Sequence, residues 1–135
     1  MQYTPTSEEL EDSKQFTAAE RMQYCMSRIV EGEEVWGLAE EEGWIINEVD
    51  QQDTLPIWPY KAFAWQCIPA KWPNAETQAV SLEHFVYKVS QMLIDNNIMV
   101  EIFPTPLKKG ELIEPREFFK ILQGMMDSGE YYLEQ

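Results

Sequence analysis

Apolar side chains recur at helical spacing in three segments, and each segment starts at a residue suited to begin a helix. The first starts at Thr17, whose hydroxyl forms a capping-box pattern with Glu20, and it ends at Gly32. The second starts at Ser81 and the third at Pro115. The apolar stripe of the first helix consists of Met22, Cys25, Met26, Ile29 and Val30. The pattern therefore predicts three amphipathic helices, and Pro59 favours a fourth, short helix after it.

Short runs of strand-forming residues lie between these helices. We expect an antiparallel meander over residues 35–38, 44–49 and 54–58, and a second pair of strands over 98–103 and 111–113. The connections within each group are too short for parallel crossovers. The sequence therefore predicts an α+β fold, with an antiparallel sheet of about five strands and three to four helices packed mainly on one face.

The distribution of these elements predicts one folded domain over residues 16–127. Residues 1–15 are polar and acidic and are expected to form a flexible arm, and residues 128–135 form an acidic tail. Pro56 has no amide hydrogen to donate to a neighbouring strand. The third strand of the meander is therefore expected to be an edge strand or to be bulged at that position.

The charge balance limits the possible partners. The chain has 24 Asp and Glu against 10 Lys and Arg, which gives a formal net charge of −14. Such a chain is poorly suited to phosphate backbones or anionic membrane surfaces, and a partner chosen by charge is basic. Cys25 and Cys67 lie in apolar surroundings, and no basic and apolar leader opens the sequence. These features predict a cytoplasmic protein, and they leave its oligomeric state open.

Residues 29–60 contain nine acidic residues, no Lys or Arg, and three tryptophans. Carboxylates around exposed aromatic side chains form a surface that steers and anchors a basic protein. The alternative is that the tryptophans are core residues and the acids only solvate turns. The candidate binding residues are Trp36, Glu40, Glu41, Glu42, Trp44, Trp58 and Phe103.

Other chemistry has less support in the sequence. Glu48, Asp50 and Asp53 offer hard oxygen ligands, but their spacing does not match a calcium loop, and no metal or cofactor is expected. His84, the single histidine, lies on the outer face of its predicted helix, far from a buried cysteine nucleophile. No catalytic residue is assigned, and the sequence favours a protein without enzymatic activity.

Two aromatic–proline corners, over residues 55–59 and 103–106, each end a predicted strand. If both lie on one side, they can form a rigid shelf with a small-molecule or enzymatic pocket beside Trp58 and Phe103. Otherwise they are architectural turns.

Six blocks of sequence occur in a characteristic order, over residues 34–38, 42–44, 55–59, 63–64, 81–85 and 103–106. Together they resemble the DUF2750 family of small bacterial proteins, whose function is unassigned. The usual aspartate before glycine in the first turn is replaced here by Glu42. The resemblance spans roughly residues 18–122 and implies a bacterial cytoplasmic protein, but it carries over no catalytic residue.

The function favoured by these observations is a non-enzymatic protein-binding module, immunity-like or regulatory, that meets a basic partner through its acidic, tryptophan-bearing surface. The alternatives are a small-molecule-binding protein or enzyme with an acidic pocket at the corners, and a structural subunit of a larger complex.

Overall fold

The computed structural model describes residues 5–41, 43–68 and 72–128. Both helices and strands are present in quantity, so the α+β class is confirmed. The helices are α1 (Ser7–Ser13), α2 (Ala18–Gly32), α3 (Lys61–Gln66), α5 (Leu82–His84), α6 (Ser90–Asp95) and α7 (Pro115–Ser128), with the π-helix η1 (Phe85–Val89) between α5 and α6. The strands are β1 (Glu34–Glu40), β2 (Gly43–Trp44), β3 (Asn47–Val49), β4 (Gln52–Ile57), β5 (Glu76–Ser81), β6 (Met99–Ile102) and β7 (Glu111–Ile113).

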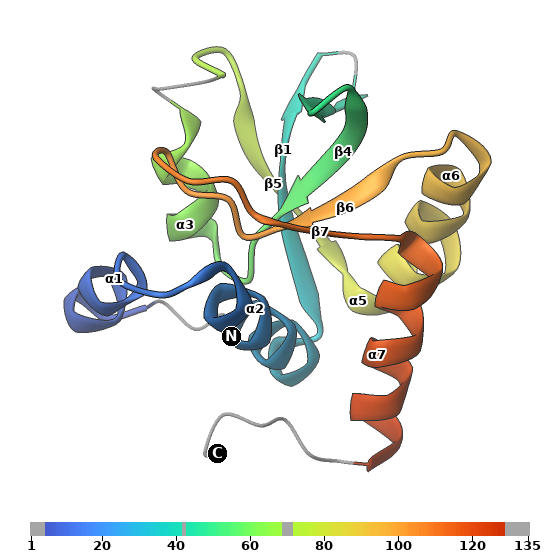
Figure 1. Cartoon of the computed structure of the whole chain (residues 1–135), viewed down its shortest axis with the longest axis horizontal. Coiled ribbons are helices and arrows are strands. Elements are labelled where there is room, and N and C mark those ends of the chain that lie inside the picture. Colours follow the sequence, from blue (N-terminus) through green and yellow to red (C-terminus); the bar gives the residue numbers. More distant parts are fainter. Residues whose placement is uncertain (1–4, 42, 69–71, 129–135) are drawn as a thin grey trace.

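The strands form two small sheets rather than one. The first has the order β2-β1-β5 and the second the order β3-β4-β6-β7. The predicted return strand over residues 44–49 is divided between them, since β2 pairs with β1 and β3 pairs with β4. The sheets are joined where Trp36 and Trp58 exchange backbone hydrogen bonds of 3.0 and 2.8 Å. Figure 1 shows α2 and α7 below the sheets and α3 beside them.

The prediction of an entirely antiparallel sheet was wrong in one pair of strands. β4 and β6 run parallel, from the Thr54–Met99 pair to the Ile57–Ile102 pair. Their connection is not short, because it contains α3, β5 and the α5–η1–α6 helix. The parallel pair was missed because sequence neighbours were assumed to be sheet neighbours. β6 does lie inside its sheet, between β4 and β7, as expected for the most apolar strand.

Pro56 lies in an interior strand, contrary to the prediction of an edge. The β3 pairing ends at Thr54, and the link to β1 begins only at Trp58. On this side of β4, Pro56 lies after the end of the pairing with β3 and before the start of the contact with β1. No neighbouring strand needs a hydrogen bond from the missing amide hydrogen there, so none is lost.

Helix starts were predicted accurately because their signals are local. Thr17 accepts a hydrogen bond from the Glu20 amide at 3.1 Å, and the Glu20 carboxylate accepts one from the Thr17 amide at 2.8 Å. The same reciprocal arrangement starts α1, inside the segment predicted to be a flexible arm, with Thr6 and Glu9 as the pair. Strand β5 was not among the predicted strands.

Candidate functional site

A cleft of about 750 Å³ lies at one end of β1, between α1, the C-terminal end of α2 and the start of α3. It is the strongest candidate for a binding site because four separate segments converge on it, and three of them, α2, β1 and α3 with its N-cap, supply aromatic or charged side chains. The residues that define its walls and mouth are Leu10, Arg28, Glu31, Glu34, Trp36, Tyr60, Lys61 and Trp65.

The first aromatic–proline corner supplies one wall of the cleft. Pro59 turns the chain from β4 into α3, and Tyr60 is the extended N-cap residue of that helix. Trp65, one turn further along α3, is 59% exposed, which is high for so large an apolar side chain. Trp36 on β1 is largely buried, and its indole Nε1–H donates to Glu34 Oε1 at 3.1 Å. Three aromatic side chains therefore line a cleft that is open to solvent.

Arg28 organises the inner end of the cleft. Its guanidinium donates to Glu9 Oε2 at 3.5 Å and to Glu31 Oε1 at 3.3 Å. It also hydrogen-bonds to the Tyr60 hydroxyl and lies 5.2 Å from the centre of the Tyr24 ring. The Tyr24 hydroxyl donates to the same Glu9 oxygen at 2.8 Å. We call these five residues the Arg28 cluster.

The Arg28 cluster perturbs the ionisation of its members. Burial raises the pKa of Tyr60 to about 12, although the neighbouring guanidinium acts in the opposite direction. Burial and the hydrogen bond to Glu9 raise the pKa of Tyr24 further still. Burial tends to lower the pKa of Arg28, but the surrounding tyrosines and carboxylates outweigh it and raise the value. Both phenols are therefore neutral and the guanidinium is charged at neutral pH.

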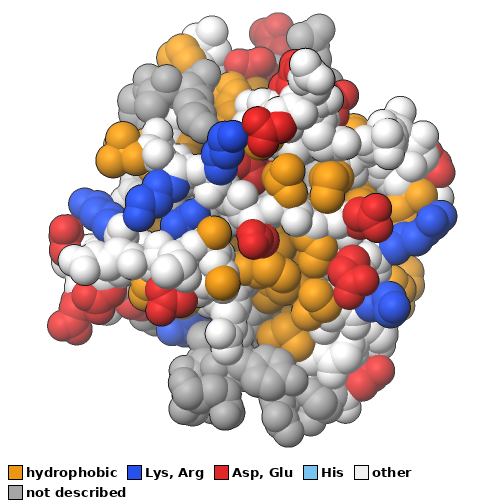
Figure 2. Space-filling view, viewed as in Figure 1, with side chains coloured by type: hydrophobic (Ala, Val, Ile, Leu, Met, Phe, Trp, Pro, Cys, Tyr) orange, Lys and Arg blue, Asp and Glu red, His pale blue; other side chains and the backbone are white. Residues whose placement is uncertain are grey.

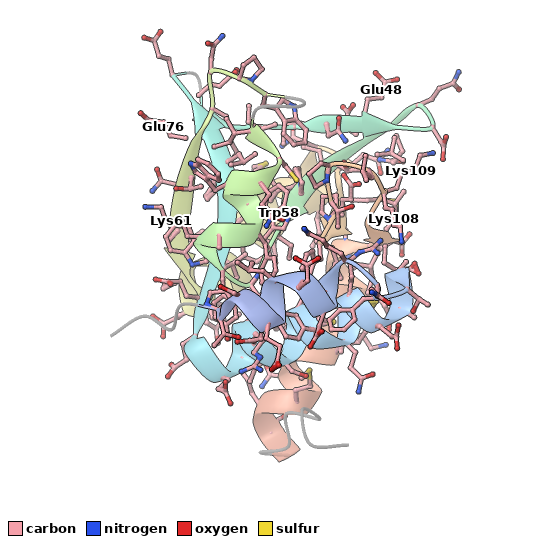
Figure 3. All side chains as sticks on the ribbon, turned by 90° about the vertical axis from the view of Figure 1, so that its left-hand side faces the viewer. Glu48, Trp58, Lys61, Glu76, Lys108 and Lys109 are labelled. Carbon is pink, nitrogen blue, oxygen red and sulfur yellow. The ribbon has the colours of Figure 1, made fainter. Side chains whose placement is uncertain are left out.

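Two carboxylates and one lysine lie at the mouth of the cleft. The Glu31 side chain is 48% exposed, and Glu34 is half-buried beside Trp36. Lys61 is the opposing cation; it is exposed and makes no ion pair with any residue that the structure describes. Figure 3 shows Lys61 on the outer side of the molecule, whereas Trp58 lies in the interior behind α3. A ligand with a positive charge and an apolar body matches this combination of carboxylates and aromatic rings.

The cysteines and the histidine lie away from this cleft. Cys25 and Cys67 are buried, and burial raises the pKa of the Cys25 thiol well above its usual value. His84 is exposed in α5. Within the described ranges, no three His, Cys, Asp or Glu side chains gather into a group that could hold a metal ion.

Three of the sequence-predicted binding residues, Trp36, Trp58 and Phe103, are buried in the core, and of these Trp36 also lines the cleft. Trp58 is buried, and its indole donates to the Pro104 carbonyl at 2.8 Å, so the two aromatic–proline corners do meet. Phe103 packs against Phe63 with ring centres 4.7 Å apart and against Tyr24 at 6.1 Å. The corners are packed together and act as architecture, so the pocket predicted beside Trp58 and Phe103 is filled by side chains.

The remaining predicted binding residues do not form one surface with Trp36. Trp36 lines the cleft, whereas Trp44 is half-buried and lies over Gly37, where an added Cβ would be 2.6 Å from its ring. Glu40 and Glu41 are exposed at the far end of β1, and Glu42 lies outside the described residues. Six residue steps along a strand separate Glu34 from Glu40, which is about 20 Å.

The space-filling view in Figure 2 shows no single acidic patch among the described residues of the visible face. Acidic side chains are spread over the visible face, with Lys and Arg between them (Figure 2). The acids of residues 29–60 therefore form separate groups, and only the group of Glu31 and Glu34 adjoins the cleft.

Sequence reasoning missed Arg28, Tyr60 and Trp65. Arg28 is seven residues from Arg21 on α2, and nothing in the local pattern distinguishes the two arginines. Trp65 could have indicated the site from the sequence. A helix as short as α3 cannot bury side chains on all of its faces, so an aromatic residue in it can be left exposed for binding.

The DUF2750 family model, described as a protein of unknown function, matches residues 22–122. The chain belongs to this family. The match includes α2 from Met22 onward and all of β1 and α3, so it covers every wall of the cleft except α1. No curated protein and no solved structure matches the chain. No described helix is long and apolar enough to cross a membrane.

Proposed function

We propose that the chain is a non-enzymatic protein-binding module, immunity-like or regulatory, that receives a basic side chain of its partner in the aromatic cleft. The observation that supports the proposal is the convergence of Glu31 and Glu34 with Trp36, Tyr60 and Trp65 around one opening. We place this function in the bacterial cytoplasm, which suits the two buried free thiols.

An arginine or lysine side chain has both properties that this cleft can recognise. Its aliphatic stem can lie on the aromatic rings, and its charge can meet the carboxylates at the mouth. A cation on an aromatic face contributes roughly 0.5–2 kcal/mol, and an exposed ion pair about 0.2–1 kcal/mol. These contributions are too small for tight binding, so the cleft is expected to act as one anchor point within a larger interface.

The overall charge supports the same partner. At a net charge of −14, the chain attracts a basic protein from a distance and repels an acidic one. Lys61 and Arg28 act against this preference, because their two charges match those of Glu31 and Glu34 in the lining, and Glu9 beside Arg28 adds a third carboxylate. Association is therefore expected to weaken as salt is added.

A titration with N-acetyl-arginine amide tests the cleft directly, with N-acetyl-leucine amide as the uncharged comparison. Indole N–H signals in NMR spectra report binding, since the Trp36 indole lies at the cleft. We expect millimolar, salt-sensitive binding of the arginine derivative, and we expect Trp65→Ala to weaken it. Equal binding of both compounds would contradict the proposal, because charge would then play no part.

A matched pair of charge variants locates the site. Glu31→Gln with Glu34→Gln removes two charges at the cleft and leaves an oxygen to accept the Trp36 indole hydrogen bond. Glu40→Gln with Glu41→Gln removes the same charge at the other end of β1. We expect the first pair to lower affinity about three- to ten-fold and the second pair less than two-fold. Equal losses would indicate a general charge effect rather than a site.

The natural partner can be identified by passing cell lysate over the immobilised chain and washing at low and then at high salt. The immobilised wild-type chain and the Trp65→Ala variant are compared at both salt concentrations. A basic protein retained at low salt by the wild type alone is the expected result.

A small-molecule ligand is the second candidate, because about 750 Å³ lies within the usual range for such sites. A ligand screen that shifts the Trp36 indole signal, combined with no response to the arginine derivative, would favour it.

A further inference from the structure

Helix α1 forms one side of the cleft, although it lies at the edge of the molecule. Pro5 and Leu10 line the cleft from this segment, opposite the α3 wall. Figure 1 shows α1 beside α2, away from the two sheets, and in Figure 3 it lies in front of α2. The family match begins at residue 22, so α1 is an addition to the part of the chain that the family model covers.

The attachment of α1 to the rest of the chain depends on few side chains. Glu9 Oε2 accepts from the Tyr24 hydroxyl at 2.8 Å and from Arg28 at 3.5 Å. Leu10 packs half-buried against the core. Ser13 is the buried residue of this helix, but its hydroxyl donates to the Leu10 carbonyl and so satisfies the helix itself. Pro5, just before the helix, is also buried at the cleft, and Glu9 and Leu10 are the attachments made from α1 itself that a substitution can remove.

The connection to α2 is short and fixed at its far end. Only three residues, from Lys14 to Phe16, separate α1 from the N-cap Thr17. The Phe16 carbonyl accepts from Arg21 Nη1 at 3.0 Å, and the Phe16 ring packs against Tyr24. Release of Glu9 and Leu10 can therefore free α1 without disturbing the start of α2.

We propose that α1 is a partial cover along one side of the partner site, held by Glu9 and Leu10, and that a partner entering the cleft competes with α1 and displaces it. This inference rests on the proposed function and concerns the regulation of that site. Arg28 lies between the Glu9 and Glu31 carboxylates, so an incoming cation competes with Arg28 for both. Leu10 lines the cleft opposite the aromatic wall, so its displacement makes room for the apolar stem of the same side chain.

Once α1 is released from the cleft, it is also expected to lose its helical structure. A helix of seven residues is unstable on its own in water, because nucleation is costly and few hydrogen bonds follow it. The freed segment is therefore expected to unfold and leave the cleft open. The cover is thus reversible, and its strength depends mainly on the contacts of Glu9 with Arg28 and Tyr24 and on the burial of Leu10.

The test uses the full chain with Glu9→Gln and Leu10→Ala, and with Glu8→Gln as the control on the same helix. Glutamine at position 9 keeps the capping box but loses the charge that meets Arg28. Leu10→Ala weakens the cover without a change in charge. Glu8 is exposed and forms no ion pair with any residue in the described ranges, so its neutralisation matches the charge change of Glu9→Gln.

Hydrogen exchange and ligand titration give two independent measurements. We expect the α1 amides of Leu10 and Lys14 to exchange about two- to five-fold faster in Glu9→Gln and Leu10→Ala than in the control. We expect Leu10→Ala, which leaves every charge in place, to bind N-acetyl-arginine amide more tightly by a similar factor, since α1 then competes less. Glu9→Gln is compared by hydrogen exchange alone, because it also removes a carboxylate that the cation meets.

Each outcome separates the cover from the binding site. Faster exchange with unchanged affinity would overturn the competition and leave the proposed function intact. Unchanged exchange in both variants would overturn the role of Glu9 and Leu10 in holding the helix. Absence of binding in the wild type and in Leu10→Ala would overturn the proposed function itself, and with it the competition.

Discussion

Arg21 and Arg28 lie seven residues apart on α2, about two helical turns, yet the structure uses them in opposite ways. Arg21 is 2% exposed and donates to the backbone carbonyls of Phe16, Phe103 and Lys109 at 2.8 to 3.0 Å. The side chain of Arg28 is 22% exposed, and its ion-pair partners are the carboxylates of Glu9 and Glu31. One guanidinium binds main chain in the core, and the other binds side chains at a cleft.

The kind of partner decides what each arginine can do. Arg21 binds backbone carbonyls at both ends of the segment 103–110, which connects β6 and β7. Because a backbone carbonyl can move away from Arg21 only if the chain around it partly unfolds, these hydrogen bonds fix the segment. The opposite side of that segment is held by Glu101, whose Oε2 accepts from the Gly110 amide at 3.0 Å. Carboxylate side chains can rotate away, so the bonds of Arg28 can be exchanged for those of a ligand. Whether an arginine has a structural or a functional role thus depends on how freely its hydrogen-bond partners can move, as well as on how deeply its own side chain is buried.

The largest expected effect comes from Arg21→Met, which keeps the aliphatic bulk and removes all three hydrogen bonds. Burial lowers the pKa of Arg21 and Glu111 opposes this, but the group stays charged, and its loss leaves buried carbonyls without donors. We expect a loss of about 3–5 kcal/mol in the free energy of unfolding, measured by urea denaturation. A loss below about 1 kcal/mol would mean that the 103–110 segment does not depend on Arg21.

Glu101→Gln tests the other side of the same segment. The buried carboxylate accepts from Asn47 and Thr54 at 3.3 Å and from the Gly110 amide. An amide in its place directs its NH₂ group at one or more of these donors, so that a hydrogen bond is lost. We therefore expect a loss of about 1–3 kcal/mol in the free energy of unfolding, measured by urea denaturation. Glu48→Gln, an exposed change on the edge strand β3 of the same sheet, is the control and is expected to stay within about 0.5 kcal/mol of the wild type.

These two residues also show where sequence reasoning stops. Helix starts were predicted because Thr17, Glu20, Ser81 and Pro115 act on their immediate neighbours. The partners of Arg21 lie up to 88 residues away, and those of Glu101 up to 54 residues away. Only the three-dimensional arrangement brings them together, so no local pattern identifies either residue as structural.

The candidate site was predictable only in part for the same reason. Trp36 and the acidic character of its surroundings were identified, because both belong to one stretch of sequence. That stretch was expected to fold as one meander, whereas β1 carries Glu34 and Glu40 to opposite ends. The cleft also needs α1, α2 and α3, and their proximity depends on the division of the strands between two sheets.

High pH is expected to weaken the cleft before it weakens the segment held by Arg21. The pKa of Tyr60 is raised by burial to about 12, above the ordinary value of about 10 for an unfolded chain. A raised folded-state pKa means that the stability is complete below about pH 10 and is lost as the pH rises toward 12. We expect wild type to lose about 1 kcal/mol more than Tyr60→Phe between pH 9 and pH 11, measured by urea denaturation. Equal losses would show that Tyr60 ionises as an exposed phenol.

The smallest expected effect on stability, and the sharpest test of the comparison, comes from Arg28→Met. Its ion pairs are partly exposed, so we expect a loss of at most about 1 kcal/mol in the free energy of unfolding. Exchange of the α1 amides should nevertheless rise, because the charge that holds Glu9 is gone. The two arginine variants should therefore separate stability from the cover: Arg21→Met destabilises the whole fold, and Arg28→Met releases one helix. If Arg28→Met cost as much as Arg21→Met, Arg28 would be a second structural arginine, and its carboxylate partners would not be free to exchange for a ligand.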